Sequence, residues 1–178
     1  MAKRGKRRKR AQGGSAKELL AASAGGSPAD LLGEASRLFA AARYADVRAL
    51  LTPAFASWAG ASAGEAAAFH DLVELRYVLA ASLVQLGDYG AARAEIARIR
   101  TIRPDHVGAA RQEIYIDRAE GKFCTEIAHL RTLIAALERR IAAGDNIAYH
   151  TVFLASACSM LGEALTLTGE SAAAGDAF

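Results

Sequence analysis

Apolar residues recur at helical spacing along most of this chain, from residue 28 onward. Between residues 29 and 41 the spacing is three or four positions, which predicts an amphipathic helix. Ser27 and Pro28 precede it, and a serine N-cap followed by a proline is a typical helix start. A second helix is expected after Tyr44. The apolar positions of the two helices are Leu31, Ala35, Leu38, Phe39, Val47, Leu50, Leu51 and Phe55.

The segment 73–106 is a 34-residue unit with a recognisable internal order. Its two helices are expected to meet at Gly87, which is followed two positions later by Tyr89. Gly121 and Phe123 repeat this pair 34 residues further on, and the apolar positions that follow are also kept. Two consecutive units in phase indicate a repeat. The positions in the first unit are Leu79, Ala80, Leu83, Leu86, Gly87, Asp88, Tyr89, Ala92, Ile96, Ile99 and Pro104.

Degenerate units are expected on both sides of this pair. In the first of them Ala42 stands where the turn glycine would be. In the last, Gly169 lies 48 residues after Gly121, which is one repeat length with a 14-residue insertion. The insertion should lengthen the helices beside it, with Gly144 closing the earlier one. The predicted units span about 28–61, 73–106, 107–140 and 155–178, the last being incomplete.

The order of small, aromatic and proline positions in 73–106 resembles the tetratricopeptide repeat, a helix–turn–helix module. One module cannot bury its own apolar face, so neighbouring modules stack. The resemblance implies an all-α fold, an α-solenoid of stacked helix pairs over residues 28–178. It also implies a concave groove, lined by the first helix of each pair, that holds an extended peptide or another protein's helix. The chain departs from the family pattern at Arg76 and Glu113, where tryptophan and leucine are usual.

The first-helix positions of the two central units give the candidate groove residues. Arg111, Tyr115 and Arg118 lie at i, i+4 and i+7 and so share one helical face. Two guanidinium groups around a phenol suit a carboxylate or an acidic peptide, because arginine donates bidentate hydrogen bonds. The alternative is that they are ordinary solvated side chains. The full set is Tyr77, Ala81, Val84 and Gln85 in one unit, and Arg111, Gln112, Tyr115 and Arg118 in the next.

Positive charge is concentrated at the N-terminus. The formal net charge of the chain is +3, and seven of its cations lie there. Residues 11–178 therefore have a net charge of 3 − 7 = −4. The composition of residues 1–27 predicts disorder. Such a tail suits a polyanion such as nucleic acid, an anionic membrane surface or a localisation receptor, and it equally suits a purely solubilising role. The seven cations are Lys3, Arg4, Lys6, Arg7, Arg8, Lys9 and Arg10.

The sequence contains no recognisable catalytic or metal-binding motif. Its four histidines are scattered, and Cys124 and Cys158 have no ligand-like spacing, so we expect no metal, cofactor or disulfide. No secretion signal or membrane span is predicted. These observations favour a non-catalytic protein of the cytoplasm.

Three functions remain open at this point. The first is a scaffold that binds a protein or peptide in its groove. The second is the N-terminal docking array of a larger enzyme, similar to the O-linked N-acetylglucosamine transferases, because the chain stops part-way through a unit. The third is a nucleic-acid-associated protein that acts through its basic tail.

Overall fold

The computed structural model describes residues 27–58 and 66–170. The basic tail predicted for residues 1–27 lies outside the described residues apart from Ser27, and so does the end of the last predicted unit, 171–178. Helices and short turns account for the described ranges, which contain no strand. The predicted all-α fold is confirmed at this level. The helices are α2 (Pro28–Ala40), α3 (Tyr44–Trp58), α4 (Ala66–Gln85), α5 (Tyr89–Ile102), α6 (Val107–Ala119), α7 (Phe123–Ala142) and α8 (Ile147–Leu167).

The predicted helix start at Ser27 is present as a capping box. The Ser27 hydroxyl accepts a hydrogen bond from the backbone N–H of Asp30, and the Asp30 carboxylate accepts one from the backbone N–H of Ser27. Pro28 occupies the first helical position. Two backbone donors that the helix leaves free are thereby satisfied.

The predicted turns between paired helices share one geometry. Gly87 and Gly121 have φ values of 75° and 69°, the left-handed conformation that glycine adopts without steric cost. At each turn the next residue donates its N–H to a carbonyl five positions back, as Asp88 does to Leu83 at 2.9 Å. Ala42 adopts a φ of 56° in the equivalent turn, so alanine there takes up a conformation that glycine would adopt more easily. Each turn is a Schellman motif that reverses the chain.

The later insertion lengthens two helices, as the sequence predicts. Gly144 closes α7 at a φ of 77° with the same hydrogen-bond pattern. Helices α7 and α8 contain 20 and 21 residues, whereas α5 and α6 contain 14 and 13. Asn146 stands at the N-cap of α8, but its side chain makes no capping hydrogen bond there.

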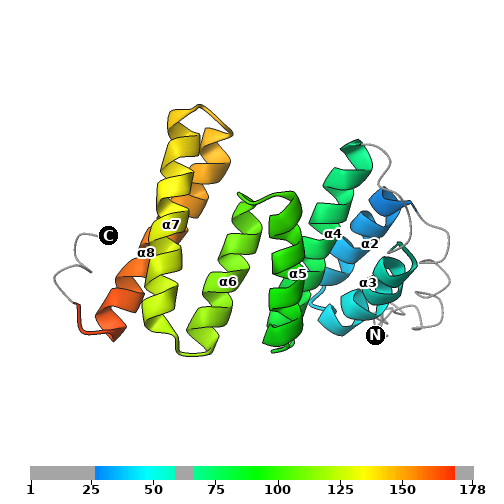
Figure 1. Ribbon diagram of the computed structural model, residues 1–178, viewed down its shortest axis with the longest axis horizontal. Coiled ribbons are helices and arrows are strands. Elements are labelled where there is room, and N and C mark those ends of the chain that lie inside the picture. The colour runs from blue at the N-terminus through cyan, green and yellow to red at the C-terminus, as the bar shows by residue number, and fades with distance from the viewer. Residues whose placement is uncertain (1–26, 59–65, 171–178) are drawn as a thin grey trace, which may run out of the picture.

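Each helix packs against its neighbour in the chain, and α4 also packs against both α2 and α6. Figure 1 shows the helices following one another along the long axis, with α2 and α3 near one end and α8 at the other. Buried side chains form two clusters. The first is built from α2 to α5 together with Ala109 and Ile116 of α6. The second is built from α7 and α8 together with Val107 and Ile114 of α6. Helix α6 therefore contributes to both cores.

Ion pairs account for the two residues that depart from the repeat pattern. Arg76 Nη1 lies 2.7 Å from Glu95 Oε2 of α5, and the guanidinium stacks 4.3 Å from the centre of the Phe55 ring. Glu113 Oε2 lies 2.5 Å from Arg100 Nη2 of α5. At both positions an ionic contact between helices stands where the resemblance leads one to expect an apolar side chain.

Helix α8 is the most apolar of the described helices. By length and composition alone it is able to cross a membrane, although 28% of its most apolar window is buried within the protein. A core helix of a soluble protein meets the same criterion, so this single helix is weak support for a membrane role. Its exposed apolar side chains are Ile147, Tyr149, Val152 and Leu167.

Candidate functional site

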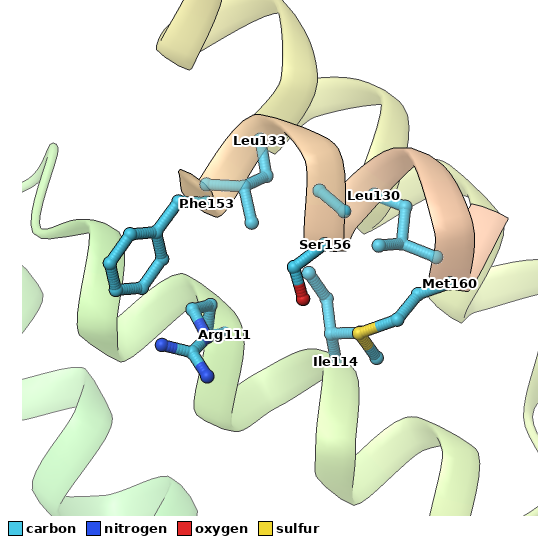
Figure 2. A pocket seen from close by; sticks show the side chains of 8 residues that line it. Arg111, Ile114, Leu130, Leu133, Phe153, Ser156 and Met160 are labelled. Atoms are coloured by element: carbon cyan, nitrogen blue, oxygen red, sulfur yellow. The ribbon is translucent and has the colours of Figure 1, made fainter. Parts of the chain in front are cut away.

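Helices α6 and α8 do not close fully on each other, and a narrow hollow of about 10 Å³ lies between them. Its floor is apolar and comes partly from α7. Figure 2 shows Phe153 beside Arg111 at one end of the hollow and Met160 beside Ile114 at the other. The lining residues are Arg111, Ile114, Leu130, Leu133, Phe153, Ser156, Ala157 and Met160.

Arg111 lies at the edge of this hollow among aromatic rings. Its Nη2 donates a hydrogen bond of 2.8 Å to the hydroxyl of Tyr115, one helical turn further along α6. Its guanidinium carbon lies 4.5 Å from the centre of the Phe153 ring and 5.5 Å from that of Tyr115. Stacking on these rings favours the cation and leaves much of the guanidinium edge able to donate further hydrogen bonds.

The charge on Arg111 is not balanced within the described residues. No carboxylate of residues 27–58 or 66–170 lies within 4.0 Å of its guanidinium, whereas every other partly buried arginine there has one. A half-buried cation without a counter-ion costs free energy that an anionic ligand would recover. The paired arginines are Arg43, Arg76, Arg93, Arg100, Arg103, Arg118 and Arg140.

Arg118 is held by partners on other helices, contrary to the expectation from its spacing. Its Nε donates to Glu126 Oε1 of α7 at 2.7 Å, and its Nη1 donates to Glu163 Oε2 of α8 at the same distance. Its Nη2 donates to the carbonyl of Met160 at 2.9 Å. Three acceptors on two helices therefore occupy this guanidinium, and it joins α6, α7 and α8.

Glu126 explains why Arg118 is held so firmly. The Glu126 side chain is completely buried, and its Oε2 has no hydrogen-bond partner. Burial raises the pKa of this carboxyl, and the bond from Arg118 opposes that rise. Without the guanidinium, the structure would contain a buried and uncompensated carboxylate.

The other predicted groove residues lie in different surroundings. Gln112 is only 5% exposed and its Oε1 has no partner, so the expectation that it lines an open groove is wrong. Ala81 and Val84 are also buried, because α4 packs against α2, α3, α5 and α6. Gln85 is exposed at the end of α4. Tyr77 is partly buried and faces a second hollow.

The second hollow, of about 180 Å³, is lined by residues of α4 and of the N-terminal ends of α6 and α8. Its charges are balanced internally, since Arg103 pairs with Glu74 and Arg140 with both Asp105 and Asp145. His106 caps α6 by accepting the N–H of Ala109 at its Nδ1. The lining residues are Glu74, Tyr77, Arg103, Asp105, His106, Val107, Gly108, Arg140, Tyr149 and His150.

Glu74 is the acidic centre of this hollow. His106 Nε2 lies 3.4 Å from its Oε1, and this contact lowers the pKa of the Glu74 carboxyl. Arg103 and His70 reinforce the effect electrostatically, while burial opposes it. The carboxylate therefore remains ionised and holds α4 to the start of α6.

Tyr149 and Phe153 connect the two hollows, and neither was identified from the sequence. Their ring centres are 4.4 Å apart, with Tyr149 lining the larger hollow and Phe153 the smaller. Both lie between the predicted units 107–140 and 155–178, where the repeat register gives no first-helix position. Helical spacing was the sequence signal that pointed to them, because Tyr149, Phe153, Ser156 and Met160 lie at i, i+4, i+7 and i+11.

The side chains of the candidate site are suited to binding a ligand. In the part of the chain that the structure describes, none of them are arranged to coordinate a metal ion. No group of three or more His, Cys, Asp or Glu side chains there is placed to hold a metal ion. What the site offers is an unbalanced cation, aromatic rings and an apolar floor. Comparison with family models, with curated proteins and with solved structures found no match for this chain.

Proposed function

We propose that this protein is a non-catalytic, tetratricopeptide-like scaffold that binds an acidic protein segment on the face formed by α4, α6 and α8. The repeat architecture is itself part of the proposal. The recurring left-handed turns at Gly87, Gly121 and Gly169 and the packing of α2, α4 and α6 in succession support it.

The observation that carries the proposed function is the unbalanced charge of Arg111. Paired carboxylates stabilise the other partly buried arginines of the described ranges, so the absence of one here stands out against a consistent pattern. An arginine stacked on aromatic rings keeps its orientation, which favours bidentate pairing with a carboxylate. The adjacent hollow gives the rest of the ligand an apolar surface.

A peptide array tests this function. Peptides of random sequence with a fixed central glutamate, and the same peptides with glutamine, are probed with the wild type and with Arg111→Ala. We expect the wild type to prefer the glutamate set and the variant to lose that preference. Arg131→Ala is the matched control, because Arg131 is exposed on α7 and has no carboxylate partner among the described residues. Equal glutamate preference in wild type and Arg111→Ala would refute the proposal.

A further inference from the structure

Aromatic rings extend across the proposed binding face on both sides of Arg111. Tyr149 contacts Phe153, as described above, and Tyr77 lies with its ring centre 5.4 Å from that of His106. Tyr77 and Tyr149 line the same hollow. The face therefore presents flat apolar rings from three alternate helices, α4, α6 and α8, with one unbalanced cation among them.

Two phenol groups on this face have unused hydrogen-bonding capacity. Within the described ranges, the hydroxyls of Tyr77 and Tyr149 have no hydrogen-bond partner, whereas that of Tyr115 accepts a bond from Arg111. Partial burial raises the pKa of the Tyr149 phenol, so the group keeps its proton and acts as a donor. The phenols and Arg111 together make the wall rich in donors.

A helical wall cannot extend a β-sheet. The backbone N–H and C=O groups of α6 and α8 bond within their own helices, so an extended ligand finds no main-chain ladder. A ligand with free N–H groups would leave them without partners against the apolar floor. A polyproline II segment avoids this cost, since proline lacks the N–H and the conformation needs no internal hydrogen bonds.

We propose that the segment bound on this face is proline-rich, extended and interrupted by an acidic residue. This inference rests on the proposed function and specifies its ligand. Proline rings pack on Tyr149, Phe153 and Tyr77, as in other aromatic grooves that recognise polyproline II segments. The ligand's carbonyls accept hydrogen bonds from the two free phenols, and its carboxylate pairs with Arg111.

Three synthetic peptides test the proposal by fluorescence anisotropy with the full chain. The proline–glutamate peptide has four prolines on each side of a central glutamate, and the proline–glutamine peptide has glutamine in its place. In the glycine–serine peptide, glycine and serine replace the prolines around the glutamate. We expect the proline–glutamate peptide to bind at least about tenfold more tightly than the other two. Arg111→Ala should remove the difference between the two proline peptides and leave the proline preference.

Substitutions at Tyr149 separate the ring from the hydroxyl. We expect Tyr149→Ala to weaken binding of the proline–glutamate peptide about tenfold and Tyr149→Phe to weaken it less. The side chain is 46% exposed, so both variants should keep the wild-type helical circular dichroism. Equal affinity for the proline–glutamate and the glycine–serine peptides would overturn the proline assignment while leaving the acidic-peptide function intact. If no glutamate peptide binds, in solution or on the array, both proposals fail.

Discussion

Two successive junctions between helices differ in how they are closed. At the α4–α6 junction the Tyr77 ring of α4 packs directly against the backbone of α6 at Gly108. A Cβ atom on Gly108 would lie 2.7 Å from Cε2 of Tyr77, and Ala109 next to it is fully buried. At the α6–α8 junction, long side chains make the contact and a hollow remains. The α4–α6 junction, called here the tight junction, separates two units in 34-residue phase. The α6–α8 junction, called the open junction, follows the insertion. The departure from the repeat length thus coincides with the candidate binding surface.

Removing the Arg118 side chain, which spans the open junction, should have the largest effect on the free energy of unfolding. Arg118→Ala leaves Glu126 buried without its partner, and breaking a buried ion pair in this way costs about 3–5 kcal/mol. We expect a loss near the lower end of that range, because Arg118 is 30% exposed. Urea denaturation followed by circular dichroism measures it.

Arg111→Ala is the control for this substitution. It removes a guanidinium from the same face of α6, but one without a carboxylate partner among the described residues. The expected loss is below about 1 kcal/mol, as for most substitutions without a buried partner. Equal losses in the two variants would show that Arg118 does not hold the junction.

The tight junction should respond to a single methyl group. Gly108→Ala places a Cβ against the Tyr77 ring, which has to move, and overpacking of this kind costs about 1–3 kcal/mol. Gly90→Ala is the matched helical control, because nothing lies within 4 Å of its Cβ position. That change should stabilise by about 0.5–1 kcal/mol. Thermal or urea unfolding of both variants measures the contrast, and similar values would contradict close packing at Gly108.

The open junction should accept added volume. Ser156→Leu adds apolar atoms at the edge of the hollow between α6 and α8, and we expect a gain in unfolding free energy of up to about 1 kcal/mol. Ser159→Leu is the control, since both serines are exposed but only Ser156 lines the hollow. The first variant should also bind acidic peptides more weakly. If Ser156→Leu lost as much stability as Gly108→Ala, the α6–α8 junction would have no room for added atoms.

The smallest expected effect is the pH dependence of the buried carboxyl at the open junction. The pKa of Glu126 is raised in the folded state, so the folded protein binds this proton more readily than the unfolded chain. The contribution of Glu126 to stability therefore rises as the pH falls from about 7 toward the ordinary pKa of a glutamate, about 4.3. Relative to Glu126→Gln, which cannot titrate, the wild type should gain stability over that range. Urea unfolding at several pH values checks the sign, and a constant difference would contradict it.

The sequence predicted the local features of the fold well. Turn glycines, the Ser27 cap and the long helices beside the insertion follow from local rules, because a left-handed residue or a capping hydroxyl acts within a few positions. Even Ala42 was placed correctly in its turn. The arrangement of repeats into a tetratricopeptide-like array remains a proposal.

The candidate site was predicted only in part, because partners distant in sequence decide which side chains are free. Helical spacing placed Arg111 and Arg118 on one face of α6. It could not show that Glu126 and Glu163, from two other helices, occupy Arg118. Gln112 was misplaced for the same reason, since packing between helices buries it. Phe153 was missed because it lies between the predicted units 107–140 and 155–178 and so has no position in the repeat register.

NMR observation of the side-chain Nε–H groups distinguishes the free arginine from the paired one. In the free protein the Arg118 Nε–H should exchange slowly with water, since it donates to buried Glu126, and that of Arg111 should exchange faster. When the proline–glutamate peptide is added, we expect the Arg111 signal to shift and the Arg118 signal to stay in place. A protected Arg111 in the free protein, or a shift confined to Arg118, would contradict the contrast between the two arginines and the binding role proposed for Arg111.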